Sequence, residues 1–398
     1  MRVIHIITQL ELGGAQQNTL FTLKKLDRSK FEPVLITGKE GILAPQARSL
    51  KEVKCFFLST LHRRIHPVWD LAAFFHLLLI LQKARKENPK ICVHTHSSKA
   101  GILGRWAAFA AGIRIIVHSV HGFGFHDFQN PLVKKIFIFL EKISARITSQ
   151  IIFVSQADFT RAVQLRICRP KGQGRVIRSG IDLKQFWRDQ NALTRHRKAI
   201  TQKSFPLVGM IACFKPQKSP LDFLYMASRV SCVFPEARFM MVGDGKMRPL
   251  IQHLAKELSL QNRLILAGWR KDIMDLLPEF NVLVLTSLWE GLPRVLVEAT
   301  ALGIPIVATN ISGNHEIIRQ GVNGYLVPPR NPSVMAGKVI SLLQNPGQLS
   351  YTEEKRRSLL HGFDIHSMVA QQEQMYQKLM ENGAQSLYLP VRVNSPIS

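Results

Sequence analysis

Residues 287–307 read SLWEGLPRVLVEATALGIPIV and give the clearest indication of fold class in the chain. Val282–Thr286, immediately before them, is a β-branched and leucine-rich run typical of a buried strand. Apolar residues then recur at helical spacing over Arg294–Leu302, and Pro293 suits the first helical position because its missing N–H is no loss there. A glycine and a proline end the helix before a second apolar run. The stretch therefore predicts a βαβ unit.

Two carboxylates frame the turn of this unit. Glu290 stands just before the helix and Glu298 lies within it, so the backbone N–H groups at the helix start open between them as an anion site. A nucleotide diphosphate would fit this layout, because Glu298 could accept hydrogen bonds from two ribose hydroxyls and Glu290 from hydroxyls of a sugar. A glutamate taken alone is more often a solvated helix residue, so the spacing of the two carries the prediction.

Glu290, Glu298 and the tail ATALGIPIV (299–307) resemble the signature of family 4 of the retaining glycosyltransferases, also described as glycosyl transferases group 1. The resemblance extends from Val3 to about Tyr376. It implies the GT-B fold, which is α/β with two Rossmann-like doubly wound parallel-sheet domains facing a cleft. It also implies that the turn binds a nucleotide-sugar donor, with Glu290 as a catalytic and donor-binding residue and with further donor contacts from Gly291, Leu292 and Glu298.

The chain is long and strongly basic. Its 398 residues are enough for two domains, and a hydrophobic content of 46% supports two packed cores. Residues 1–200 carry 33 Lys and Arg against 12 Asp and Glu, a balance of +21, whereas residues 201–398 carry 20 against 15, a balance of +5. Such a field favours an anionic partner, which could be a nucleic acid, an anionic lipid surface or a diphosphate-bearing substrate.

The cysteines and the apolar runs indicate a cytoplasmic setting. The five cysteines are odd in number, widely spaced and without a C-x-x-C pair, as expected for a reduced compartment. No signal peptide is visible after Arg2. The longest apolar stretch, Leu71–Leu81, is shorter than the roughly 20 residues that span a bilayer, so the chain is not expected to cross a membrane.

Strand-like runs alternate with helical patterns in both halves, which predicts a doubly wound parallel sheet in each. These runs are Arg2–Thr8, Val34–Thr37, Val53–Leu58, Ile91–Thr95, Ile115–His118, Ile151–Val154, Pro206–Ala212, Arg238–Val242, Leu264–Ala267, Val282–Thr286, Ile306–Ala308 and Tyr325–Val327. The predicted divisions are an N-terminal acceptor-side domain (1–187), a basic linker (188–205), a nucleotide-sugar-binding domain (206–364), a C-terminal helix (365–381) and a disordered tail (382–398). The family resemblance implies that the C-terminal helix crosses back to the first domain.

Glycine turns after other predicted strands resemble the donor loops of the family. Glycine lets backbone N–H groups approach a phosphate without a Cβ in the way. The expected donor contacts of this kind are Gly13 and Gly14 after the first strand, Gly243 and Gly245 in VGDGKMRPLI (242–251), and the GWRKDI loop (268–273) with Arg270, which resembles the loop that contacts the nucleobase.

Lys218 is the expected catalytic cation. It precedes a predicted helix and would place a positive charge on the diphosphate, where negative charge develops as the sugar departs. The family pattern has an arginine five residues earlier, and this chain has Cys213 there. Lys215 or Arg294 is therefore expected to supply the second phosphate cation.

Histidines flank the ends of two predicted strands. A His-x-His such as His94 and His96 could bind a metal ion or donate structural hydrogen bonds. No carboxylate or cysteine lies beside the pair at the spacing of metal ligands, which favours a structural role for these two and for His118. His121 differs, because HSVHGFGF (118–125) matches the His-Gly that the family sets beside the donor sugar, so it is an expected catalytic residue. The chain has no Asp-x-Asp, and neither a metal ion nor another cofactor is expected.

Two basic amphipathic stretches, His66–Lys86 and Pro131–Arg146, predict helices that could lie in an anionic headgroup layer. Their apolar faces could instead pack on the sheet, and the charge balance of the first half favours the membrane surface. The acceptor entrance would then be lined by Phe123, Phe125 and Phe128 around His126, together with His121.

These patterns predict a metal-independent, retaining glycosyltransferase that moves a sugar from a nucleotide sugar, expected to be a UDP-sugar. The expected acceptor is a glycan or a polyprenyl-diphosphate-linked lipid in cell-surface polysaccharide, lipopolysaccharide or glycolipid synthesis. The expected location is the inner face of the membrane, peripherally bound. A GT-B nucleotide-sugar epimerase remains an alternative. A second alternative is a basic nucleic-acid-binding protein, although the sequence has no stripe of interleaved aromatic and basic residues.

Overall fold

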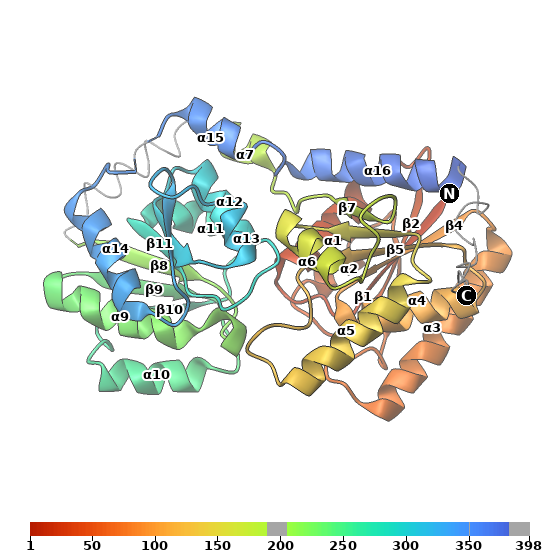
Figure 1. The fold of residues 1–398 in the computed structure, drawn as a ribbon, viewed down its shortest axis with the longest axis horizontal. Helices are drawn as coiled ribbons and strands as arrows, with labels where there is room; N and C mark the ends of the chain where they lie inside the picture. The colour runs from red at the N-terminus through yellow and green to blue at the C-terminus, as the bar shows by residue number, and fades with distance from the viewer. Residues whose placement is uncertain (189–204, 350, 382–398) are drawn as a thin grey trace, which may run out of the picture. The chain divides into compact units, whose positions relative to one another are not determined.

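The structure is a computed structural model that describes residues 1–188, 205–349 and 351–381. These residues form two compact units, one made of Met1–Ile177 with the segment from Ser367, and the other of Arg178–His366. Each unit is a parallel β-sheet with helices packed on it (Figure 1). Residues 189–204 of the predicted linker and the predicted tail, 382–398, lie outside the described residues.

The sheet of the first unit, within the described residues, has seven parallel strands in the order β3-β2-β1-β4-β5-β6-β7. The strands are β1 (Arg2–Ile7), β2 (Glu32–Gly38), β3 (Lys54–Leu58), β4 (Ile91–His96), β5 (Ile115–Val120), β6 (Gln150–Phe153) and β7 (Gly174–Val176). The sequence predicted the first six. It missed β7 because that edge strand has only three residues, GRV, all half-buried, which give no periodic signal.

The helices of this unit are α1 (Gly14–Lys25), α2 (Ala44–Arg48), α3 (Pro67–Glu87), α4 (Ser98–Ala110), α5 (Pro131–Ala145), α6 (Gln156–Gln164) and most of α16 (Ile365–Glu381). Alternate residues of β1 point to opposite faces of the sheet. Ile4 and Ile6 join a core cluster with residues of α3 and α4, whereas Ile7 joins one with Leu20 and Leu23 of α1. Burial on both faces is why the central strands are continuous apolar runs.

Helix α16 is tied to the first unit by hydrogen bonds. The hydroxyl of Tyr376 lies 2.6 Å from Nδ1 of His94, and Oγ1 of Thr22 donates to Oε1 of Gln372 at 3.2 Å. The backbone N–H of Asp27 donates to Oε1 of Glu373 at 2.7 Å. Because Tyr376 is fully buried, its side chain forms part of the interior of the first unit.

The sheet of the second unit, over its described residues, has six parallel strands in the order β10-β9-β8-β11-β12-β13. The strands are β8 (Leu207–Ile211), β9 (Arg238–Val242), β10 (Leu264–Gly268), β11 (Val282–Leu285), β12 (Ile306–Thr309) and β13 (Gly324–Val327). The helices are α7 (Leu183–Arg188), η1 (Pro216–Lys218), α9 (Pro220–Val233), α10 (Arg248–Glu257), α11 (Ile273–Leu276), η2 (Leu277–Glu279), α12 (Arg294–Ala301), α13 (Ser312–His315), α14 (Pro332–Gln344) and α15 (Glu353–Leu359). All six strands match predicted runs to within two residues at each end.

Each sheet has one place where the strand order reverses. In the first unit this lies between β1 and β4, and in the second between β8 and β11. Helices on either side of such a point run to opposite faces of the sheet and leave a crevice at the carboxyl ends of the strands, where ligands bind in doubly wound folds. The residues that follow β1, β4, β8 and β11 are therefore positioned to form a ligand site.

Candidate functional site

The loops after β8 and β11 bring Lys218 and Glu290 together. Nζ of Lys218 donates a hydrogen bond to Oε1 of Glu290, and Oγ of Ser287 donates to the same oxygen at 2.6 Å. The side chains of Lys218 and Glu290 are 16% and 8% exposed. A lysine and a glutamate predicted independently to act on the leaving phosphate and on the sugar are thus direct partners at the point where the strand order reverses. Ser287 was not predicted.

The backbone around this pair is held by further hydrogen bonds. The N–H of Leu288 donates to the carbonyl of Gln217 at 2.8 Å, and Nε2 of Gln217 donates to the carbonyl of Trp289 at 2.7 Å. Oγ1 of Thr286 donates to the carbonyl of Lys218 at 2.7 Å. These reciprocal bonds fix the two loops against each other, so the ammonium and the carboxylate are positioned before any ligand arrives.

Helix α12 carries the second predicted carboxylate. Glu298 forms an i,i+4 ion pair with Arg294, with Oε1 3.6 Å from Nη2 and both side chains mostly buried. Burial raises the pKa of Glu298, while Arg294 opposes that shift, and burial also lowers the pKa of Arg294. The prediction that Pro293 occupies the first helical position is wrong, because Pro293 has extended backbone angles (φ −76°, ψ 107°) and is the N-cap residue.

Gly243 and Gly245 follow β9 and have positive φ angles of 131° and 156°. A Cβ at Gly243 would lie 2.0 Å from the carbonyl oxygen of Ala212, and one at Gly245 would lie 2.4 Å from that of Phe214. Glycine is needed here because two backbone segments touch. The contact supports the loop that carries Lys218, and direct binding of a ligand by these glycines stays a prediction.

The remaining predicted donor-binding and phosphate-binding positions of the second unit differ in their surroundings. Arg270 is exposed, and its guanidinium is engaged by Asp272, to which Nε donates at 2.8 Å. Cys213 and Lys215 are both half-buried, and the N–H of Lys215 donates to the carbonyl of Cys213 at 2.9 Å. Gly291 lies close to Gly313, since a Cβ on Gly313 would be 2.3 Å from the carbonyl oxygen of Gly291. Leu292 is buried.

In the first unit, Gly13 and Gly14 lie at the start of α1, after β1. Gly13 is the N-cap with extended angles (φ −154°, ψ 161°), and no side chain caps the helix. A Cβ on Gly13 would meet only the flexible side-chain oxygen of Gln16, at 2.8 Å. The fold itself therefore does not demand glycine at this position, in contrast to Gly243 and Gly245.

Four histidines gather at the carboxyl ends of β1, β4 and β5. Nδ1 of His5 lies 2.9 Å from Nε2 of His96, and Nδ1 of His96 lies 3.1 Å from Nε2 of His121. Nε2 of His94 lies 2.8 Å from Oγ of Ser119, and Nδ1 of the same ring contacts the hydroxyl of Tyr376. Burial lowers the pKa of His5 to about 3 and that of His121 to about 4, so these rings are neutral at neutral pH.

Nitrogen atoms of His5, His94 and His96 lie within 4.8 Å of one another, close enough to hold a metal ion. Hydrogen bonds already use each of their ring nitrogens except Nε2 of His5, which has no partner among the described residues. This pattern favours the predicted structural role for His94 and His96. His118 has a similar role, since its Nδ1 lies 2.9 Å from Oγ1 of Thr95.

The prediction that Phe123 and Phe125 line an acceptor entrance is wrong. Both are buried, with their rings stacked 4.5 Å apart, and both belong to a core cluster that includes Phe153 of β6. Apolar rings next to a β-sheet are better placed in its core than at a solvated opening. Phe128 is 44% exposed, and His126, partly buried, lies beside it.

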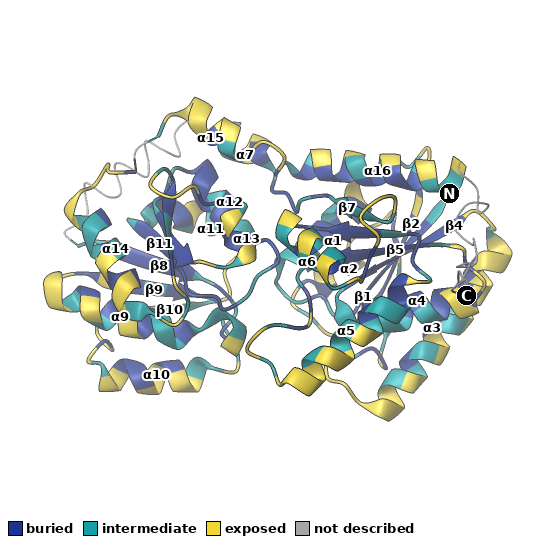
Figure 2. Cartoon of the chain, in the orientation of Figure 1, coloured by how far each residue is buried: buried dark blue, intermediate teal, exposed yellow. Residues whose placement is uncertain are grey.

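Helices α3 and α5 carry many exposed residues (Figure 2), and several of these residues are large and apolar. On α3, Leu77 and Leu81 pack into the core, whereas the outer face exposes Val68, Trp69, Leu71, Phe75 and Leu79. On α5 the exposed apolar residues are Leu132, Val133, Ile136 and Phe139. These side chains therefore do not all pack on the sheet, and binding of the two helices to a membrane surface stays a prediction.

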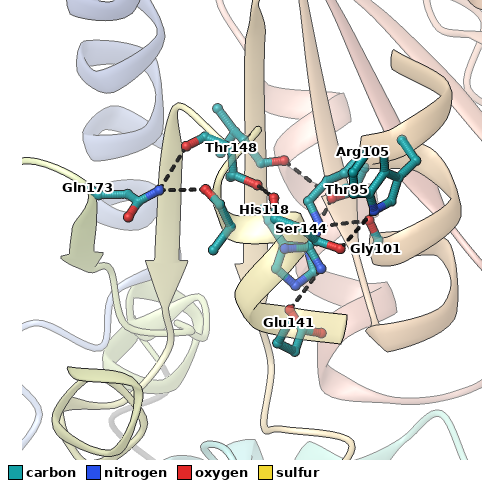
Figure 3. A network of polar contacts seen from close by, with 11 residues as sticks. Thr95, Gly101, Arg105, His118, Glu141, Ser144, Thr148 and Gln173 are labelled. Atoms are coloured by element: carbon teal, nitrogen blue, oxygen red, sulfur yellow. Dashed lines mark hydrogen bonds and ion pairs between the residues drawn. The ribbon is translucent and has the colours of Figure 1, made fainter. Parts of the chain in front are cut away.

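Polar contacts hold the inner face of α5 (Figure 3). Arg105 of α4, which is fully buried, donates through Nη2 to Glu141 of α5 at 2.8 Å and through Nε to the carbonyl of Gly101 at 2.8 Å. Nε1 of Trp106 donates to Oγ of Ser144 at 3.1 Å. The outer apolar face is thus presented by a helix that is firmly anchored on its other side.

By length and composition alone, α3 is the one described helix apolar enough to cross a membrane. It has 21 residues, and only 22% of its most apolar window is buried in the protein. Its inner residues, including Leu77 and Leu81, nevertheless belong to the core cluster of the sheet.

Comparison with known proteins places the chain among sugar-transferring enzymes. Residues 12–185 match the model of Glycosyltransferase Family 4, and residues 194–359 match that of Glycosyl transferases group 1. The chain is 30% identical over 386 residues to UDP-Gal:alpha-D-GlcNAc-diphosphoundecaprenol alpha-1,3-galactosyltransferase of Escherichia coli, covering 96% of this chain and 98% of the relative. It is 25% identical over 330 residues to N,N'-diacetylbacillosaminyl-diphospho-undecaprenol alpha-1,3-N-acetylgalactosaminyltransferase of Campylobacter jejuni, covering 80% and 84% of the two chains.

Solved structures share the fold. HepE of Anabaena, determined in complex with UDP-glucose, superposes with a TM-score of 0.76 at 21% identity over 96% of this chain and all of that one. Sucrose-phosphate synthase of Thermosynechococcus elongatus gives a TM-score of 0.76 at 18% identity. The two parallel sheets and these neighbours confirm the predicted GT-B class. With both halves matched to their family models and a relative aligned along nearly the whole chain, the protein belongs to the family 4, group 1 glycosyltransferases of GT-B fold and is a glycosyltransferase.

Proposed function

We propose that this enzyme transfers a sugar from a UDP-sugar to an acceptor carried on a polyprenyl diphosphate, with retention of configuration and without a metal ion. The observation that carries the proposal is the Lys218–Glu290 pair at the carboxyl edge of the second sheet. An ammonium has three N–H donors, of which Glu290 takes one, so Lys218 can also bind a phosphate oxygen. Glu290 can accept hydrogen bonds from the hydroxyls of the sugar that this phosphate carries.

The chemistry needs charge stabilisation more than proton donation. The bond between the sugar C1 and the phosphate oxygen breaks, the acceptor oxygen bonds to C1 on the same face, and the acceptor proton passes to the departing phosphate. Negative charge grows on the diphosphate during this step, and a fixed cation stabilises it most in the transition state. Lys218 supplies that cation, with Lys215 or Arg294 as the second, in place of the arginine replaced by Cys213.

The E. coli relative supports the proposed donor and stereochemistry, because its name gives UDP-Gal as the donor and an alpha-1,3 product. Because UDP-galactose is itself the α anomer, this outcome is retention. Glu298 then binds the ribose hydroxyls, and the Arg270 loop lies beside the base. His121 contacts the sugar, and the open start of α1 at Gly13 and Gly14 accepts the diphosphate.

The acceptor is membrane-linked. The names of the E. coli and C. jejuni relatives both state a diphosphoundecaprenol-linked acceptor. The exposed apolar faces of α3 and α5 would enter the headgroup layer, and exposed lysines beside them would contact anionic lipids. Because α3 also contributes to the core of its sheet, it would lie on the surface of the bilayer, bound peripherally.

A panel of UDP-sugars tests this proposal. Each would be incubated with a polyprenyl-diphosphate-linked sugar in detergent, with the soluble sugar phosphate or with buffer alone, and the release of UDP and the mass of the lipid product would be measured. Lipid-dependent release of UDP with a heavier lipid product is expected. Conversion of UDP-GlcNAc to another UDP-sugar without an acceptor would indicate the epimerase. Equal transfer to the soluble sugar phosphate would contradict the proposal that the acceptor is membrane-linked.

A further inference from the structure

Two buried histidines of the first unit, His5 and His96, form a hydrogen-bonded chain that ends at the half-buried His121. Nδ1 of His5 faces Nε2 of His96 at 2.9 Å, and Nδ1 of His96 faces Nε2 of His121 at 3.1 Å. The rings of His5 and His96 stack with an interplanar angle of 11°. We propose that His5 and His96 are positioning residues that hold His121 with its proton on Nδ1, so that it presents one N–H donor to an oxygen of the donor sugar. This rests on the proposed function, which sets His121 beside that sugar.

Each ring in the chain carries a single proton. Burial lowers the pKa of all three histidines, since a charged imidazole loses its hydration inside the protein. A neutral imidazole has one N–H donor and one acceptor nitrogen. His96 uses both nitrogens inside the chain, so the proton it carries determines the direction of both hydrogen bonds.

Only two arrangements satisfy this condition. In the inward arrangement, Nε2–H of His121 donates to His96, Nε2–H of His96 donates to His5, and His5 carries its own proton on Nε2. In the outward arrangement, Nδ1–H of His5 donates to His96, Nδ1–H of His96 donates to His121, and His121 carries its proton on Nδ1. The tautomer of His121 is thereby coupled to that of His5 through the ring of His96, which lies between them.

The surroundings of His5 favour the outward arrangement. Its Nε2 is buried and has no hydrogen-bond partner in the described part of the chain. The inward arrangement would leave an N–H there without an acceptor, whereas the outward one leaves only a lone pair. Buried N–H groups are rarely left unsatisfied, and acceptors somewhat more often. The outward arrangement therefore costs less free energy.

This arrangement limits what His121 can do. Its Nε2 accepts the hydrogen bond of His96 and cannot serve as a general base for the reaction. Its Nδ1–H is a donor of fixed orientation, suited to a hydroxyl or ring oxygen of the sugar. A group positioned in this way before the substrate arrives lowers the reorganisation needed in the transition state.

Nitrogen NMR of the full-length protein with ¹⁵N-labelled histidine tests the proposal directly, because protonated and bare ring nitrogens have widely separated shifts. The His121 signals are assigned by their loss in His121→Gln. A proton on Nδ1 and a bare Nε2 are expected in the unaltered enzyme. A proton on Nε2, or an equal mixture of the two tautomers, would overturn the proposal. The measurement needs no substrate, so its result is independent of the transferase assay.

Two substitutions at His96 give the functional readout. His96→Leu removes the donor to His121 and should lower kcat by about 2- to 10-fold, the range for one hydrogen bond, with a mixed tautomer at His121 and little change in donor KM. His96→Asn keeps an N–H at the position of Nδ1 and should restore both the tautomer and kcat. His118→Leu is the matched control, since His118 is equally buried and bonds a hydroxyl outside the chain. Loss of kcat in His118→Leu equal to that in His96→Leu, or an unchanged His121 tautomer in His96→Leu, would reduce His96 to a packing residue.

Discussion

Replacing Lys218 by alanine removes the cation that donates a hydrogen bond to Glu290, the proposed catalytic glutamate. Glu290 is 8% exposed and accepts hydrogen bonds from Lys218 and Ser287, so the variant leaves the carboxylate with Ser287 as its remaining side-chain donor in the described structure. An unfolding experiment in urea should show a loss of about 1–3 kcal/mol, because a mostly buried charge loses a partner. The backbone ties of Thr286 and Gln217 should keep the loops in place.

The effect on turnover should be larger than the effect on stability. A cation on the leaving diphosphate acts mainly as charge develops, so Lys218→Ala should lower kcat by about 10²–10³ with a smaller change in donor affinity. UDP release under saturating donor and acceptor measures kcat, and calorimetry with UDP measures binding. Lys256→Ala, an exposed lysine of α10, is the control and should change neither.

A double variant separates the two effects. Lys218→Ala with Glu290→Gln removes the unpaired charge and should recover most of the lost stability, while turnover should stay low because both groups proposed to act in catalysis are gone. If Lys218→Ala keeps more than about a third of the unaltered kcat with a normal fold, the lysine does not stabilise the leaving group, and the Lys218–Glu290 pair is only structural.

Three other predictions follow from separate parts of the structure. Glu298→Gln should weaken UDP binding measured by calorimetry. In the unaltered enzyme, UDP binding should weaken as pH falls through a midpoint above the ordinary glutamate value of 4.5, because burial raises the pKa of Glu298, the carboxylate proposed to bind the ribose; a midpoint below 4.5 would contradict that assignment. Arg105→Leu should lower the free energy of unfolding by about 3–5 kcal/mol, because it leaves Glu141 buried and unpaired. The double variant Arg105→Leu with Glu141→Leu should lower the free energy of unfolding much less, and an equal decrease in the two variants would refute the pairing. Replacing the exposed lysines Lys83, Lys86 and Lys135 by glutamate should release the enzyme from anionic vesicles in a co-sedimentation assay without affecting UDP binding. Vesicle binding that persists in this variant, or that is equal on neutral lipid, would show that α3 and α5 do not contact the membrane.

The sheets could be predicted from sequence because their central strands are buried on both faces. Such strands appear as continuous apolar runs, as in β1 and β11, and their positions were predicted to within one or two residues. The edge strand β7 has no such run and was missed. The start of α12 was misplaced by one residue, because proline at a helix start favours the first helical position whereas Pro293 is the N-cap residue.

Contacts across the fold were harder to predict. Lys218 and Glu290 are 72 residues apart, and periodicity says nothing about which loops meet. Their partnership follows from the strand order, which places β8 beside β11. The chain from His5 to His121 was missed for the same reason, because β1, β4 and β5 must be in register before their histidines become neighbours. Phe123 and Phe125 show the opposite error, since proximity to His121 in sequence did not imply exposure.

We propose that this enzyme forms its glycosidic bond with retention of configuration and without a metal ion. Proton NMR of the lipid-linked product, made from a UDP-α-sugar in the presence of excess EDTA, tests it most directly. An α linkage, formed at the same rate with and without EDTA, is the expected result. A β linkage would contradict retention, and activity that disappears in EDTA and returns with added magnesium or manganese would contradict the role given to Lys218.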